Sequence, residues 1–202
     1  MLPETANISI DDTILVQQFR QGNSAAMERL ILKYQNRIYN VILKICANTD
    51  DAAELTQETF VKVIENIEQF QGRSSFYTWV FRISVNLTLN YCQKRVKLAF
   101  RSLDAELDEQ KGPVTQQLKD LLSDDSCPEP AVIAQNKELC EIARKSLMKL
   151  DDDQRAVVIL RDIEGMNYAQ IAEVLDIELG TVRSRLSRAR GNLREILESL
   201  TK

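Results

Sequence analysis

The sequence predicts an all-α protein made of two small helical domains joined by a flexible acidic linker. Three observations support this fold class. Apolar residues recur every three or four positions in two long stretches, as they do along one face of an amphipathic helix. The 202 residues include only six glycines and four prolines, which is typical of long helices with few tight turns. Between the two stretches, residues 102–130 lack this periodicity and are too many for a loop inside one compact domain.

The predicted N-terminal domain covers residues 8–101 and contains three or four helices. Asp11 or Asp12 is a candidate N-cap for the first helix. The second carries an apolar stripe made of Met27, Leu30, Tyr34, Ile38, Val41 and Ile45. The third repeats the pattern with Leu55, Phe60, Ile64 and Ile67, and the fourth with Phe76, Val80, Ile83 and Leu87. Packing these stripes against one another would form a helical bundle.

The linker, residues 102–130, carries eight acidic residues against two lysines and three of the four prolines. We expect no more than a short helical turn there, around 114–122. The predicted C-terminal domain, 131–202, contains four helices, one of them capped by Asp151 and ending before Gly165. Its last two helices are separated by the turn "DIELG", which makes them the parts of a helix-turn-helix. Their contact would join Ile171, Ala172 and Leu175 to Val182 and Leu186.

The last helix is rich in arginine. Its stretch "GTVRSRLSRARGNLR" contains five arginines and no acid. With Val182 and Leu186 directed inward, the outward face carries Arg183, Ser184, Ser187 and Arg188, which suit base edges and phosphates of a major groove. Thr181 offers a hydroxyl and backbone N–H groups to a phosphate. A solvated basic helix is the alternative, but the absence of acids directly after a helix-turn favours DNA binding.

A second cationic stretch, residues 72–101, contains six basic residues, no acid and six of the twelve aromatic residues. Cations interleaved with aromatic rings suit single-stranded nucleic acid, because bases stack on the rings while cations follow the backbone. About half of these rings are expected in the core instead, from their helical spacing. The pattern therefore indicates nucleic-acid binding less strongly than the arginine helix does.

An acidic strip precedes this stretch. It contains Asp50, Asp51, Glu54, Glu58, Glu65 and Glu68, opposed only by Lys62. Glu54, Glu58 and Glu65 share a helical face with Val61, away from the apolar stripe. Such a face would repel DNA, so it is either simply solvated or directed at a protein partner.

Composition excludes several classes of protein. Histidine is absent, and the four cysteines, at 46, 92, 127 and 140, have no CxxC spacing, which argues against zinc fingers, catalytic triads and metal or cofactor sites. No apolar run approaches the length that crosses a bilayer, and the first residues lack a signal-peptide pattern, so we expect a cytoplasmic protein with no membrane insertion. The formal net charge of −4 predicts weak DNA binding by the free chain.

Together these stretches resemble bacterial RNA polymerase sigma factors of the extracytoplasmic-function (ECF) type, from about Asp12 to Leu197. "DDAAELTQETFVKVIENIEQFQG" resembles the core-polymerase-binding helix of that family, and "SSFYTWVFRISVNLTLNY" resembles its −10-element segment. "GMNYAQIAEVLDIELGTVRSRLSRAR" resembles its −35-reading helix-turn-helix. The resemblance implies a sigma-2-like bundle, a sigma-4-like domain and promoter-directed transcription initiation with no enzymatic step.

The resemblance also implies roles for individual residues. The face that docks on the large polymerase subunit is matched by Asp51, Glu54, Leu55, Gln57 and Glu58. Ser74, Ser75, Tyr77 and Trp79 match the family positions that capture an unstacked −10 base. Asn86 and Asn90 match positions that contact the melted −10 region, and Lys94 and Arg95 would lie on nearby phosphates. The −35 readers are matched by Arg183, Ser184, Ser187 and Arg188.

Two positions depart from the family pattern: Arg73 follows Gly72 in the base-capturing loop, and Glu178 precedes the recognition helix. The resemblance therefore specifies neither the preferred −10 base nor a phosphate contact near Glu178. It implies core RNA polymerase and promoter DNA as partners, together with an anti-sigma factor, which in many relatives is membrane-anchored. The alternatives are a helix-turn-helix regulator that needs no polymerase and an enzyme using Glu54 and Glu58 as metal ligands.

Overall fold

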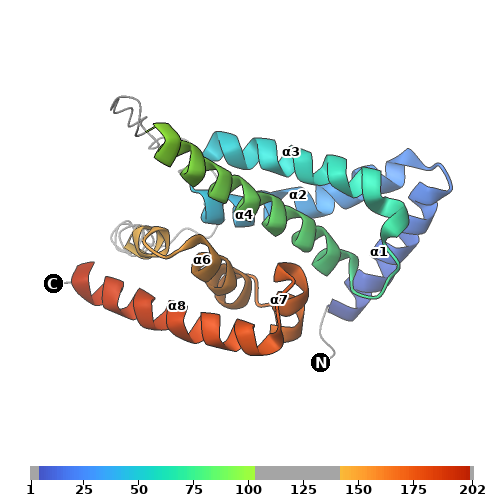
Figure 1. Ribbon diagram of the computed structural model, residues 1–202. Coiled ribbons are helices and arrows are strands. Elements are labelled where there is room, and N and C mark those ends of the chain that lie inside the picture. Colours follow the sequence, from blue (N-terminus) through green and yellow to red (C-terminus); the bar gives the residue numbers. More distant parts are fainter. Residues whose placement is uncertain (1–4, 103–141, 201–202) are drawn as a thin grey trace, which may run out of the picture.

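The computed structural model describes residues 5–102 and 142–200, and every regular element in these ranges is helical (Figure 1). The predicted all-α fold class is thereby confirmed. Beyond Ser102, the predicted linker and its helical turn at 114–122 lie outside the described residues. The division into 8–101, 102–130 and 131–202 stays a prediction.

The N-terminal bundle consists of α1 (Thr5–Arg20), α2 (Ser24–Cys46), α3 (Thr49–Asn66), the 3₁₀ helix η1 (Ile67–Gln69) and α4 (Phe76–Ser102). Its central helix is α2, which contacts α1, α3 and α4. All six residues of the predicted α2 stripe are at most 4% exposed. The three-and-four spacing of these residues therefore places the core of the bundle correctly.

The start of α1 differs from the prediction. The helix begins at Thr5, so Asp11 and Asp12 lie inside it and the predicted N-cap is wrong. Asp12 is 1% exposed, and it accepts hydrogen bonds from Lys33 Nζ at 2.6 Å and from the Tyr34 hydroxyl. A buried carboxylate needs such partners, and here they fasten α1 to α2. Burial and the Asp12 hydrogen bond raise the pKa of Tyr34.

Most of the stripe predicted for the third helix is buried, namely Leu55 and Phe60 on α3 and Ile67 at the start of η1. The prediction for Ile64 is wrong, since this side chain is 42% exposed. Thr59 and Val63 occupy the buried row instead, and Thr59 is tolerated there because its hydroxyl donates to the Leu55 carbonyl at 2.7 Å. The helix starts at Asn48, whose side chain accepts from two first-turn backbone N–H groups.

More of α4 is buried than one apolar stripe predicts. Phe76 and Val80 are buried as expected, but Ile83 and Leu87 are only half-buried. The other buried positions described on α4 run along a neighbouring face: Thr78, Phe81, Ser84, Val85, Thr88 and Cys92. The reason is that α4 also contacts the second bundle, through α6 and α7.

The C-terminal bundle contains a helical segment over 142–148, then α6 (Asp152–Val158), its π-helical continuation η3 (Ile159–Ile163), α7 (Tyr168–Leu175) and α8 (Leu179–Leu200). Asp151 occupies the N-cap position of α6 but its side chain makes no capping hydrogen bond. Asn167 and Gln170 form a capping box at the start of α7, and Asp176 ends that helix with φ 53°. These caps set the sharp turn between α7 and α8.

The predicted contact inside the helix-turn-helix is largely as expected. Ile171, Val182 and Leu186 are buried, while Ala172 and Leu175 are half-buried. Val174 and Ala189, both fully buried, complete the contact. One face of α8 is therefore committed to the core, and α8 forms the outer edge of the molecule, with α6 between it and α4 (Figure 1).

Candidate nucleic-acid interface

The outward face of α8 carries four exposed polar side chains, those of Arg183, Ser184, Ser187 and Arg188. Thr181 is half-buried at the start of the helix, where its backbone N–H donates to the Glu178 carbonyl at 2.8 Å. The Ser184 hydroxyl donates to the Thr181 carbonyl at 3.0 Å, which leaves its oxygen able to accept. Two guanidinium groups and two hydroxyls thus share one surface of a helix that can enter a major groove.

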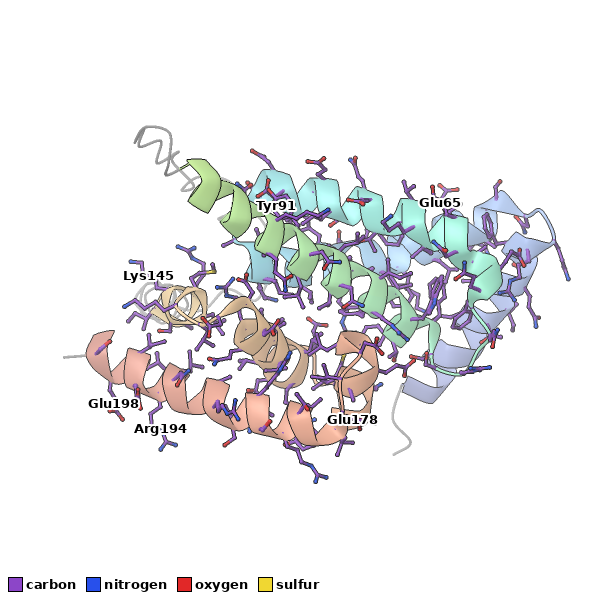
Figure 2. All side chains as sticks on the ribbon, viewed as in Figure 1. Glu65, Tyr91, Lys145, Glu178, Arg194 and Glu198 are labelled. Atoms are coloured by element: carbon purple, nitrogen blue, oxygen red, sulfur yellow. The ribbon has the colours of Figure 1, made fainter. Side chains whose placement is uncertain are left out.

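Two other arginines of the same helix are held by acids of their own bundle. Arg185 lies 3.2 Å from Asp153, and Arg190 binds Asp162 through two nitrogen atoms, at 2.5 and 3.2 Å. The hydrogen bonds that Arg190 donates to Asp162 raise the pKa of Arg190. Two of the five arginines therefore pair with acids of their own bundle, and the Arg190 side chain is still 49% exposed. Farther along, Arg194 and Glu198 project away from the N-terminal bundle (Figure 2).

A second polar strip runs along α4. Trp79, Asn86 and Asn90 lie seven and four residues apart, so they share one helical face. Asn90 is exposed, while Trp79 and Asn86 are half-buried. The Trp79 ring packs beside Phe70 and Phe76, with ring centres 5.3 and 5.8 Å away, which fixes its orientation. A partly exposed indole beside two amides can stack on a base and bond to its edge.

The neighbouring candidates lie at the two ends of this strip. Ser74 and Ser75 are half-buried in the turn before α4, and the Ser75 hydroxyl oxygen accepts the Thr78 backbone N–H at 3.1 Å. Lys94 is exposed near the other end. Arg95 is exposed too, but it lies 3.5 Å from Asp51 on α3.

Tyr77 is the candidate that the structure places apart from the strip. It is half-buried, its ring lies 4.3 Å from that of Phe81, and its hydroxyl donates to Glu164 of the C-terminal bundle at 3.3 Å. The Arg37 guanidinium lies 4.8 Å from the centre of the same ring. Burial, and then Glu164, raise the pKa of Tyr77. In this structure Tyr77 belongs to the contact between the two bundles.

The exposed face of α3 combines acidic and apolar side chains. Glu54, Gln57 and Glu58 are exposed, as the sequence predicts. The apolar part of this face is larger than the sequence pattern predicts, because Ile64, expected in the core, is 42% exposed beside Val61, which is 52% exposed. An acidic face with exposed aliphatic residues suits a protein partner better than nucleic acid.

The other two residues expected on this face are less accessible. Leu55 is 5% exposed, so it packs in the core and would act by holding the helix. Asp51 is half-buried beside Arg95 and Tyr91. Burial and the Asp51 hydrogen bond raise the pKa of Tyr91 to about 12.

Two further structural findings concern other kinds of site. Within 5–102 and 142–200, no group of three or more acidic or thiol side chains is arranged to hold a metal ion. In the same ranges, no helix is both long and apolar enough to span a bilayer.

Comparison with known families matches both bundles in chain order. The family "Sigma-70 region 2" matches residues 30–97, and "Sigma-70, region 4" matches residues 140–193. Over 191 residues the chain is 31% identical to the ECF RNA polymerase sigma-E factor of Haemophilus influenzae, covering 95% of this chain and 97% of that protein. This chain belongs to the ECF sigma factor family. An ECF sigma factor is a transcription initiation factor that directs RNA polymerase to promoters, and it is not an enzyme.

Other relatives of this sigma factor agree. The RNA polymerase sigma-H factor of Pseudomonas aeruginosa is 32% identical, with 94% of this chain and 95% of that protein covered. Two solved structures share the fold at TM-score 0.63 and 24% identity: CnrH in complex with the cytosolic domain of CnrY, and the sigma factor RpoE of Bartonella quintana in complex with the anti-sigma factor NepR. They cover 94% and 85% of this chain and 98% and 96% of those chains, respectively.

Proposed function

We propose that this ECF sigma factor docks on core RNA polymerase through the exposed face of α3, reads a −35 element with α8 and captures melted −10 DNA along α4. The observation that carries the proposal is the presence of two separate polar helix faces, one in each matched sigma region. Both faces point outward and carry side-chain types that recognise nucleic acid.

At the −35 element, α8 would enter the major groove with its first two turns. Arg183 and Arg188 would bind guanine edges or phosphates. The hydroxyls of Ser184 and Ser187 would form hydrogen bonds with either base edges or phosphate oxygens. The Thr181 hydroxyl would face a phosphate, since the Thr181 backbone N–H is already bonded to the Glu178 carbonyl. Arg185 and Arg190, bound to acids of the same bundle, would set the angle of the helix rather than read DNA.

At the −10 element, Trp79 would stack on an unpaired base while Asn86 and Asn90 bind base edges exposed by melting. Lys94 and Arg95 would contact phosphates beyond them, and Ser74 and Ser75 would border the captured base. No covalent step is needed, because the free energy of binding single-stranded DNA offsets the cost of separating the duplex.

We further propose that the factor acts in the cytoplasm under the control of an anti-sigma factor. Two solved proteins of the same fold are described in complexes, one of them as a sigma factor in complex with an anti-sigma factor. The mixed acidic and apolar face of α3 is the surface that an inhibitor would have to cover to prevent polymerase binding. The domain division at 8–101 and 131–202 belongs to the same proposal.

The test is transcription by purified bacterial core polymerase on a library of random upstream DNA. We expect initiation only when this chain is added, from templates that share a defined pair of elements. Absence of initiation, together with tight duplex binding by the free chain, would instead identify a helix-turn-helix regulator.

A charge-reversal variant tests the docking face separately. Glu54→Lys/Glu58→Lys should abolish capture of core polymerase, because both carboxylates are exposed on α3. The matched control is Glu28→Lys, an exposed acid on α2 outside the proposed face. Equal loss of capture in the control would argue against α3 as the docking helix.

A further inference from the structure

The two bundles are joined by a polar cluster around Glu164, at the end of η3. The Glu164 side chain is 6% exposed. It accepts from Arg37 Nε of α2 at 2.6 Å and from the Tyr77 hydroxyl of α4 at 3.3 Å. A second Arg37 nitrogen donates to the Glu164 carbonyl at 3.3 Å, and the Arg37 guanidinium lies over the Tyr77 ring. One carboxylate of the C-terminal bundle thus holds two helices of the N-terminal bundle.

Two more contacts support this closed arrangement. Arg155 of α6 is buried, and its Nη1 donates at 2.5 Å to the Ile45 carbonyl near the end of α2. The same guanidinium also binds three carbonyls of its own bundle, so its position is fixed. At the edge of the contact, Arg82 lies 3.4 Å from Asp176. In two of these contacts, Arg37–Glu164 and Arg82–Asp176, an acid of the C-terminal bundle forms an ion pair with an arginine of the N-terminal bundle.

The closed arrangement places the two DNA-reading helices too close together for one promoter. As the helix contacts and Figure 1 show, α4 and α8 are separated by one layer of helices, α6 and α7, and each of these two helices contacts both α4 and α8. Two helix packing distances of 8–10 Å separate their axes, or roughly 20 Å. Two turns of duplex, the separation that we expect between the −10 and −35 elements, measure about 68 Å. In addition, the ring and hydroxyl of Tyr77 are engaged by Arg37 and Glu164 and are not available to a base.

We propose that Glu164 holds the free sigma factor in a closed resting form that cannot read both promoter elements, and that binding to core polymerase separates the bundles. This inference rests on the proposed two-site promoter recognition. Separation rehydrates Glu164 and Arg155, the buried members of the contact, which offsets part of the lost attraction, so a polymerase can open such a contact. Removing Arg37 alone is different, because the Glu164 side chain, 6% exposed, would stay buried with only the Tyr77 hydroxyl as a partner. Arg37 itself is 52% exposed and stays hydrated when Glu164 is removed.

Cys92 of α4 reports on closure. It is 3% exposed, and the groups that influence its pKa include Asp152 and Arg155 of the C-terminal bundle. In a chain with Cys127→Ser and Cys140→Ser, alkylation of Cys92 followed by mass spectrometry would measure how often the bundles separate. Glu164→Gln should speed alkylation about tenfold, since it weakens charge-assisted hydrogen bonds. The control Glu178→Gln, on an exposed carboxylate of the same bundle, should leave the rate unchanged.

A charge swap distinguishes closure from unfolding. Arg37→Glu and Glu164→Arg should each speed alkylation, and the double variant Arg37→Glu/Glu164→Arg should restore most of the protection while keeping the helical circular dichroism signal. Wild-type rates in both single variants, or a double variant as fast as the singles, would overturn the proposal. These rates are measured without polymerase or DNA, so failure of promoter recognition is detected separately, by the transcription assay with the wild-type chain.

Discussion

The two candidate DNA-reading helices differ in how many sides they bury. α8 packs one face on its own bundle and leaves the opposite face exposed along its first three turns. α4 is covered on one side by its own bundle and on another by α6 and α7, which leaves only the strip with Trp79, Asn86 and Asn90 outside. Most of the recognition surface on α8 is therefore exposed in the closed form, although Arg188 lines a hollow shared with Gln93 of α4. A larger part of the surface on α4 depends on whether the bundles are closed.

The largest expected effect comes from the exposed face of α8. Arg183→Ala/Arg188→Ala should reduce initiation at the selected promoter at least about 30-fold, because two well-placed contacts with bases contribute roughly 1–3 kcal/mol each. Binding to core polymerase should not change. The control is Arg194→Ala, an exposed arginine of the same helix outside the predicted readers. Equal losses in both variants would mean that α8 contributes only general positive charge.

On α4, Trp79→Ala should reduce open-complex formation roughly 10- to 100-fold, since base stacking on an aromatic ring contributes about 1–3 kcal/mol. Permanganate reactivity of unpaired thymines measures the opening. Trp79→Phe keeps a ring and the contacts with Phe70 and Phe76, so it should retain most activity. Full opening by the alanine variant would exclude Trp79 from base capture.

The same difference between the helices explains what the sequence could predict. On α8, the positions of Val182 and Leu186 determine the inward face, so the four outward readers follow from helical spacing. On α4, spacing within one helix carries no information about a second bundle more than 60 residues away in sequence, and the engagement of Tyr77 by Glu164 was therefore missed. The predictions for Asp12 and Ile64 were wrong for related reasons. Burial of the Asp12 carboxylate depends on Lys33 and Tyr34, which lie on another helix. Thr59 can take a buried position in place of Ile64 because its hydroxyl donates to the Leu55 carbonyl of the same helix.

A smaller effect is expected on the covered side of α4. Tyr77→Phe removes the hydroxyl that donates to Glu164 but keeps the ring beside Phe81 and Arg37. The net contribution of one such hydrogen bond is about 0.5–1.5 kcal/mol, so Cys92 alkylation should rise roughly two- to tenfold. Transcription by the polymerase complex should stay within about twofold, as the ring is unchanged. A loss of open-complex formation comparable to that of Trp79→Ala would show instead that the hydroxyl contacts DNA.

The smallest effect at neutral pH is expected from substitution of Cys92, which lies on the covered side of α4, and it concerns the free energy of unfolding. Burial, and then Asp152, raise the pKa of the Cys92 thiol from 9.0 to about 11. Because burial disfavours the thiolate, the free energy of unfolding keeps its neutral-pH value below pH 9 and declines as the pH rises from 9 through 11. The full decline is roughly 2–3 kcal/mol, at 1.36 kcal/mol per pKa unit.

Cys92→Val removes this titration while keeping a similar volume, so at pH 7 the free energy of unfolding should change by less than about 1.5 kcal/mol. Urea unfolding between pH 7 and 10.5 should then show a shallower decline for the variant than for the wild type. The comparison isolates Cys92, because Tyr91, whose pKa is raised to about 12, titrates equally in both proteins. Parallel declines would mean that Cys92 is hydrated, and hence that the bundles do not close over α4 in solution.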